Sequence, residues 1–134
     1  MDTVSYVHLP ADQPPPPRPP QPFRAIVIIE QTVSNEWLVR AGCLYMLAWG
    51  QDCSAWDDSV DYANIAAFEY EDIPGDKFVM TTWHDKQPLS EVLWFASHCA
   101  SHDAVQLAYT LILHIAPNAR EAELMAAYRA AANG

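Results

Sequence analysis

Glycine and basic residues are scarce in this sequence. Only four of its 134 residues are glycine, and none builds a glycine-rich loop after an apolar run, which excludes the usual phosphate-binding loops. Seven basic residues stand against 17 acidic ones, giving a formal net charge of -10. Such a chain repels nucleic acid and anionic membranes, so we expect neither as a partner. A basic protein partner is compatible with this charge.

Cysteines are few and long apolar runs are missing. The three cysteines, Cys43, Cys53 and Cys99, show no Cys-x-x-Cys spacing, which favours reduced thiols in a cytoplasmic protein. No apolar run approaches the roughly 18 residues of a membrane span. The N-terminus lacks a signal-peptide pattern, and no Gly-x-Ser-x-Gly nucleophile motif occurs. We expect a cytoplasmic protein with no cofactor.

Proline is abundant in one place. Residues 1–22 hold eight of the eleven prolines, and a run this rich in proline favours an extended conformation without a hydrogen-bond ladder. We therefore predict a disordered proline-rich arm over residues 1–22 and a single α/β domain over residues 23–134. The arm is either a docking motif for an aromatic groove or a spacer without a partner.

The rest of the chain alternates between strand-like and helix-like patterns. Continuous apolar runs predict buried strands over residues 23–30, 78–84 and 106–116. Apolar residues at helical spacing predict helices over residues 34–49, 57–70, 88–100 and 118–133, the first of them capped by Ser34. This alternation predicts a small three-layer α/β sandwich, with a mainly parallel sheet of about three strands and helices on both faces.

Polar residues follow the predicted strands, where ligands of parallel sheets bind. His84 is a candidate general base, oriented by Asp85 or Glu30. Alternatively, Glu30, His84 and His114 supply three metal ligands of mixed nitrogen and oxygen type, with the metal unspecified. The structural alternative makes His84 and Asp85 a helix-entry turn and His114 a core histidine satisfied by a neighbour.

Two histidines lie four residues apart in the helix predicted over residues 88–100. His98 and His102 would share one helix face, which is a spacing that can hold zinc. The glutamate of the zinc-protease pattern is missing, since Cys99 follows the first histidine. A solvated helix face is the alternative interpretation.

An acidic and aromatic stretch surrounds the start of the second predicted helix. Eight carboxylates lie between residues 52 and 76, and no Lys or Arg occurs between residues 41 and 76. Aromatic side chains ringed by carboxylates suit an interface for a basic protein. The candidate binding residues are Trp49, Asp52, Trp56, Asp57, Asp58, Asp61 and Trp83. The alternative is a capped, solvated helix start whose tryptophans pack inward.

Two runs resemble a known family. Residues 43–61 read CLYMLAWGQDCSAWDDSVD and residues 78–85 read FVMTTWHD. Together they resemble a family of small uncharacterised bacterial proteins, over about residues 23–130. The resemblance implies no activity and no site residues.

Two functions follow as expectations. The first is a non-catalytic interaction or accessory module, of the immunity type, that uses the acidic aromatic stretch. It depends on the missing catalytic motifs and the concentrated charge. The second is a small metal-dependent hydrolase with its site at the carboxyl ends of the strands. The sequence leaves open whether the protein is an enzyme.

Overall fold

The computed structural model describes residues 3–10, 19–20, 22–31 and 37–134. At its centre lies a five-stranded parallel sheet in the order β1-β5-β2-β3-β4. The strands are β1 (Thr3–His8), β2 (Phe23–Ile29), β3 (Cys43–Gly50), β4 (Met80–His84) and β5 (Tyr109–Ile115). The helices are α1 (Trp37–Arg40), α2 (Cys53–Ala67), α3 (Leu89–His98) and α4 (Glu121–Ala132), with a 3-10 turn, η1 (Gly75–Lys77).

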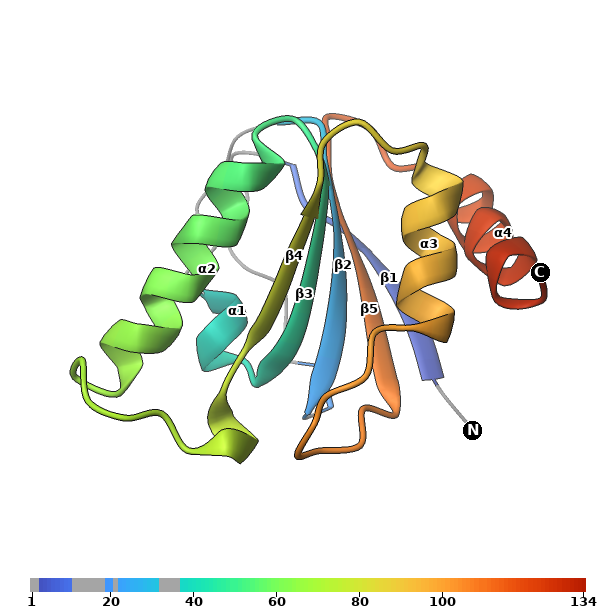
Figure 1. Ribbon diagram of the computed structural model, residues 1–134. Helices are drawn as coiled ribbons and strands as arrows, with labels where there is room; N and C mark the ends of the chain where they lie inside the picture. Colours follow the sequence, from blue (N-terminus) through green and yellow to red (C-terminus); the bar gives the residue numbers. More distant parts are fainter. Residues whose placement is uncertain (1–2, 11–18, 21, 32–36) are drawn as a thin grey trace.

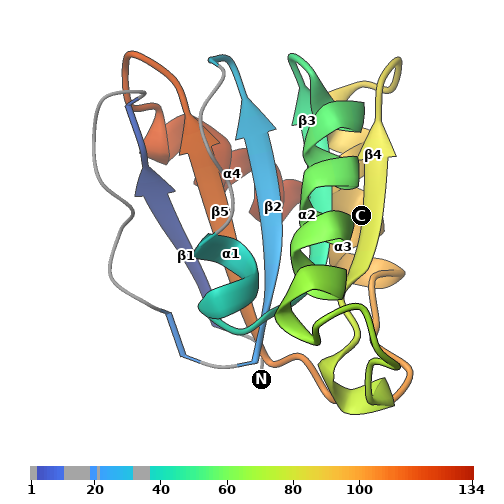
Figure 2. The same ribbon diagram turned by 90° about the vertical axis from the view of Figure 1, so that its left-hand side faces the viewer.

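Helices cover both faces of the sheet. Helices α1 and α2 lie on one face, and α3 and α4 lie on the other (Figures 1 and 2). The predicted three-layer α/β sandwich with a parallel sheet is therefore confirmed. The predicted strand number was too low, because β1 and β3 were not expected.

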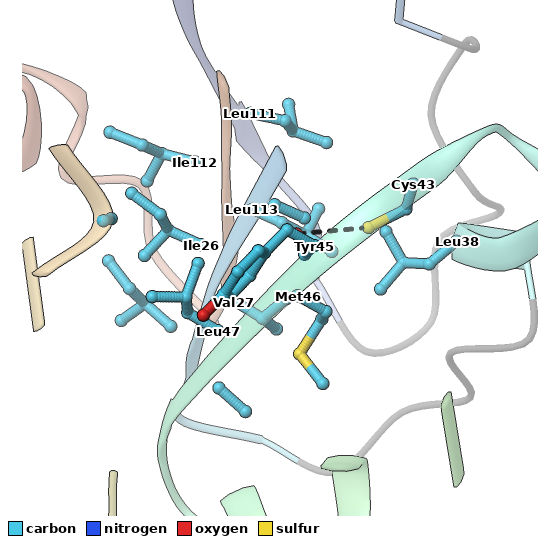
Figure 3. Packing of buried hydrophobic residues seen from close by; sticks show 14 of the residues in the cluster. Ile26, Val27, Leu38, Cys43, Tyr45, Met46, Leu47, Leu111, Ile112 and Leu113 are labelled. Atoms are coloured by element: carbon cyan, nitrogen blue, oxygen red, sulfur yellow. Dashed lines mark hydrogen bonds between the residues drawn. The ribbon is translucent and has the colours of Figure 1, made fainter. Parts of the chain in front are cut away.

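The core is built around β2, which has β5 on one side and β3 on the other. All seven of its side chains are buried, as expected of a parallel strand with helices on both faces. Figure 3 shows Ile26 and Val27 of β2 among Leu47 of β3 and Leu113 of β5. Burial raises the pKa of the nearby Cys43 thiol to about 12, so this cysteine is an inert core residue.

The helix predicted over residues 34–49 was wrong. The structure has the short helix α1 and then, from Cys43, the strand β3; Ser34 lies outside the described residues. The run Cys43–Gly50 is apolar on both faces, so its pattern has no clear period, and a wholly buried strand then cannot be told from a buried helix. Gly42, with a φ of 99°, makes the turn between the two elements.

The disordered arm over residues 1–22 was wrong at its start. Residues 3–8 form β1, which pairs with β5 along its whole length, from Thr3 with Tyr109 to His8 with His114. Leu9 is buried and its N–H donates to the carbonyl of His114 at 2.8 Å. Pro19 is also buried, whereas the prolines at 14–17 lie outside the described residues. The domain therefore begins before the proline run.

Deleting residues 1–9 should destabilise the domain. The deletion exposes the edge of β5 and removes the packing of Tyr6, Val7 and Leu9, which predicts a loss of about 3 kcal/mol or more. The free energy of unfolding would be measured by urea titration of tryptophan fluorescence. Thr3→Ala, an exposed substitution in the same strand, is the control. An unchanged urea midpoint for the deletion would show that β1 adds nothing to the fold.

Gly50 ends β3 in a conformation that only glycine adopts readily. Its φ is 107°, and a Cβ there would lie 2.3 Å from the carbonyl oxygen of Ile29. The same carbonyl accepts the N–H of Gln51 at 2.8 Å, so it cannot move away freely. Gly50 thus fixes the place where the chain leaves the sheet for α2.

Gly50→Ala should lower the free energy of unfolding by about 3 kcal/mol, because it adds both a clash and backbone strain. Gly75→Ala is the matched control, since a Cβ at Gly75 would meet nothing within 4 Å. The control should be neutral or slightly stabilising. Equal urea midpoints for the two variants would contradict this account of Gly50.

Candidate functional site

The helices that follow the neighbouring strands β2 and β5 in the chain lie on opposite faces of the sheet. Helix α1 comes after β2 and lies on one face, and α4 comes after β5 and lies on the other (Figure 1). In open parallel sheets, ligands bind where the connections diverge in this way. Glu30 lies at the end of β2, and its N–H donates to the carbonyl of Ile115 at 2.8 Å.

Four side chains form a closed hydrogen-bond network at this point. The hydroxyl of Tyr6 lies 2.7 Å from Nδ1 of His114, and Nε2 of His114 lies 3.1 Å from a carboxylate oxygen of Glu30. The other oxygen of Glu30 pairs with the guanidinium of Arg120. The backbone N–H of Arg120 donates to the Tyr6 hydroxyl at 3.0 Å and completes the ring. The network joins β1, β2, β5 and the start of α4.

The network is fully satisfied only when His114 is neutral. The Glu30 carboxylate accepts hydrogen bonds, so Nε2 of His114 carries the proton and Nδ1 accepts from Tyr6. Burial lowers the pKa of His114, as do Arg120 and His8, while the hydrogen bond and charge of Glu30 oppose the shift. His114 is completely buried, so the core-histidine interpretation holds for it.

His84 does not join Glu30 and His114, although the sequence placed all three at one site. His84 lies on β4, three strand spacings from β5, which is about 14 Å. Within the part of the chain that the structure describes, no three His, Cys, Asp or Glu side chains are arranged to hold a metal ion. The proposed metal set of Glu30, His84 and His114 is therefore wrong.

His84 has its own partners on β4 and in the turn before α3. Its Nε2 lies 2.9 Å from the hydroxyl of Thr82, and its Nδ1 lies 2.5 Å from the side-chain oxygen of Gln87. The Phe95 ring of α3 lies 5.6 Å from the His84 ring between centroids. Neither Asp85 nor Glu30 has a hydrogen bond to His84 among the described residues. The predicted orienting role of these two carboxylates is thus not seen.

His98 and His102 do not share a helix face. Helix α3 ends at His98, whose Nε2 donates to the carbonyl of Ala131 at 3.2 Å. His102 follows the helix and donates to the carbonyl of Phe78 at 2.6 Å. His98 therefore bonds to the end of α4 and His102 bonds to the segment before β4, so the two imidazoles do not form a pair.

The acidic aromatic stretch is divided by the geometry of α2. Trp56 is 3% exposed and belongs to the core, and Asp57 is also buried. The indole N–H of Trp49 donates to the backbone carbonyl of Gln87 at 2.7 Å. Asp52 and Asp58 are exposed. Trp56 and Asp57 are therefore not available as surface contacts, and the predicted face is smaller than the sequence suggested.

The outer edge of the sheet carries the remaining predicted binding residues. The hydroxyl of Thr81 on β4 donates to Asp61 on α2 at 2.8 Å. Trp83, two residues further along β4, is 50% exposed. Sequence reasoning missed Ile65 and Tyr62 of α2 here, which are also exposed, because helical spacing made Ile65 a core residue.

Asp57 has one side-chain oxygen that is buried and has no hydrogen-bond partner among the described residues. Burial raises the pKa of this carboxyl, and the charges of Asp61 and Asp58 add to the shift, while the nearby Thr81 hydroxyl opposes it. The folded protein therefore holds its proton more tightly than the unfolded chain. This makes Asp57 a cost to the fold near neutral pH.

The His114 network should make stability depend on pH. The folded-state pKa of His114 lies below the ordinary 6.5, so the folded protein binds fewer protons there than the unfolded chain. Stability from this group is complete above the ordinary pKa and is lost as pH falls toward the folded value. The free energy of unfolding should therefore fall between about pH 8 and about pH 5.

Urea titrations of wild type and His114→Gln across that range would measure this effect. The variant should be less stable near neutral pH and should show a flatter dependence on pH. His98→Gln, which changes an exposed histidine, should keep the wild-type slope. A His114→Gln slope equal to that of wild type would show that His114 does not cause the dependence.

Comparison with known proteins identifies a family but no activity. A family model described as a domain of unknown function, DUF7684, matches residues 4–131. The match includes β1, which the resemblance seen in the sequence had left outside. Neither the curated proteins nor the solved structures gave a match. No helix in the described part of the chain is long and apolar enough to cross a membrane. The chain belongs to the DUF7684 family of domains of unknown function.

Proposed function

We propose that this domain is an interaction module that binds a basic protein through the outer surface of α2 and β4. This surface, called the α2–β4 surface below, consists of Asp58, Asp61, Tyr62, Ile65 and Trp83. The observation that carries the proposal is the exposure of three large side chains there. Tyr62 is 60% exposed, Ile65 41% and Trp83 50%.

The contacts between α2 and β4 make this one continuous surface. Asp61 accepts from Thr81, and the Asn64 side chain accepts the N–H of Val79 at 3.0 Å and donates to the carbonyl of Lys77 at 3.2 Å. Because α2 connects β3 to the parallel strand β4, it runs antiparallel to both. Trp83 therefore lies beside the turn of α2 that contains Asp58.

Charge selects the partner. The chain has no Lys or Arg between residues 41 and 76, while Asp58 and Asp61 border the exposed aromatic side chains. A surface of this composition attracts a basic protein and repels nucleic acid. The aromatic side chains would supply the buried anchors of the interface, and the carboxylates would steer association. Among the strands that the structure describes, β4 pairs only with β3, so its outer edge adjoins the same surface.

The two kinds of residue should affect different rate constants. Asp58→Lys should slow association about tenfold at low salt, and less at high salt, because it reverses a steering charge. Trp83→Ala should raise the dissociation rate about 30-fold, as expected of an interface hot spot. A partner recovered with the full chain from its native host would be measured by binding kinetics at two ionic strengths.

Matched controls lie on the opposite side of the sheet. Trp94 of α3 is 44% exposed, and Glu121 opens α4, so Trp94→Ala and Glu121→Lys change a tryptophan and an acidic residue away from the α2–β4 surface. Both should bind like wild type. A partner that binds Asp58→Lys and Trp83→Ala with wild-type kinetics would rule out this surface as the interface.

A further inference from the structure

A second site lies on the other face of β4 and goes beyond the proposed interaction. Thr82 and His84 alternate with Thr81 and Trp83 along the strand, so their side chains point toward α3 and not toward α2. Thr82, His84 and Gln87 form a linear hydrogen-bond chain, with distances of 2.9 Å and 2.5 Å. A hydroxyl, an imidazole and an acceptor in this order have the arrangement of a nucleophile, a base and an orienting group.

The proton positions support this order. The Gln87 oxygen accepts a hydrogen bond, so Nδ1 of His84 carries a proton in the neutral ring. Nε2 is then the unprotonated nitrogen, and the Thr82 hydroxyl donates its hydrogen to it. Thr82 therefore already presents its proton to the group that would remove it during nucleophilic attack.

Gln87 is itself held in place. The indole N–H of Trp49, at the end of β3, donates to the backbone carbonyl of Gln87 at 2.7 Å. The ring of Phe95 lies against the other side of the site, 5.6 Å from the His84 ring and inclined to it by 58°. The imidazole thus has an aromatic wall and fixed partners for both nitrogens, so its orientation is set before any ligand arrives.

This site reaches solvent, whereas the His114 side chain does not. Thr82 and His84 are only partly buried, whereas His114 has no exposed surface. The ten-residue helix α3 begins at Leu89, directly after Pro88. N–H groups in the first turn of a helix have no acceptor within the helix, so those of Leu89 and Ser90 are donors close to Gln87. Such donors stabilise negative charge that develops on a carbonyl oxygen.

We infer that Thr82 and His84 are catalytic residues of an acyl-transfer site that hydrolyses a neutral or cationic carboxylic ester, with Gln87 as a positioning residue. Oγ of Thr82 bonds to the ester carbonyl carbon while its proton passes to Nε2 of His84. The C–O bond to the leaving alcohol then breaks, and the alcohol takes that proton. Water attacks the acyl-threonine, His84 accepts its proton and returns it to Thr82, and the carboxylic acid leaves.

The charge around the site limits the substrate. Asp85 and Glu91 are exposed on either side of Gln87 and together outweigh the exposed Lys86 between them, and the whole chain carries a net charge of -10. An anionic ester would be repelled, while a neutral or cationic one is tolerated or attracted. The rings of Trp49 and Phe95 favour an apolar or aromatic group next to the ester bond.

The test uses the full chain with 4-nitrophenyl acetate, a neutral aromatic ester. Wild type should hydrolyse it faster than an equal concentration of free imidazole, and mass spectrometry of digested protein should find the acetyl group on Thr82. His84→Gln should reduce the rate about 100-fold or to the imidazole level, since general base catalysis is lost. Thr82→Val should lose the acetyl group, and Thr82→Ser should retain both activity and acetylation.

Matched controls separate chemistry from folding and from background imidazole reactivity. Thr81→Val changes the neighbouring threonine, which bonds to Asp61 on the other face, and His98→Gln removes an exposed histidine. Both should keep the wild-type rate. Gln87→Glu should keep activity and move the acid limb of the pH–rate profile upward, because a carboxylate stabilises the protonated ring; Gln87→Leu should lose activity.

Three results would overturn the inference. They are a wild-type rate no higher than that of free imidazole, a Thr82→Val rate equal to wild type, and an acetyl group found only at other residues. If Thr82→Val does not fold, the comparison of Thr82→Ser with wild type and the position of the acetyl group still decide. None of these outcomes bears on the α2–β4 surface, which is tested by binding kinetics.

Discussion

The pairing of β2 between β5 and β3 is the constraint on which the rest of the structure depends. A parallel strand with every side chain buried must have helices on both faces, so the chain cannot form an open two-layer sheet. Even the one charged residue of β2 obeys this rule. The guanidinium of Arg24 is buried and donates to the carbonyl of Ala100 and the hydroxyl of Thr110, each at 2.8 Å. These bonds tie the end of α3 to the centre of the sheet.

The same constraint makes the carboxyl ends of the strands the place where ligands of such a sheet would bind. Two polar groups lie there, and they differ in what they leave available. In the His114 network the central imidazole is inaccessible, and both of its nitrogens have partners within the protein. The network fixes β1 and α4 to the sheet, while the side chains of Glu30 and Arg120 reach solvent. The Thr82, His84 and Gln87 chain is partly exposed, so chemistry there needs no rearrangement of the fold.

The sequence predicted the strands correctly where an apolar run was compatible with only one kind of element. The apolar runs that became β2 and β5 are bounded by polar residues, and their parallel pairing brings Glu30 and His114 together as predicted. It failed for β3, where apolar residues on both faces erased the period, and for β1, which precedes a proline run. The prediction that His84 joins Glu30 and His114 failed for a different reason. Strand order decides which carboxyl ends are neighbours, and nothing local in the sequence encodes that β4 lies at the edge.

The position of β4 at the edge explains how adjacent residues of one strand can belong to two surfaces. Successive side chains of a strand point to opposite faces, so Trp83 lies on the α2 side and His84 on the α3 side, although they are neighbours in sequence. Because β4 is an edge strand, both of these faces border solvent along its unpaired side. An exposed edge also invites unwanted pairing, and Lys77 and Lys86 stand just outside the two ends of β4, where charge opposes it. Residues that are adjacent in a short sequence motif therefore need not belong to one site. In this fold, alternation along β4 separates the proposed anchor for a partner, Trp83, from the proposed general base, His84, and each can change without the other.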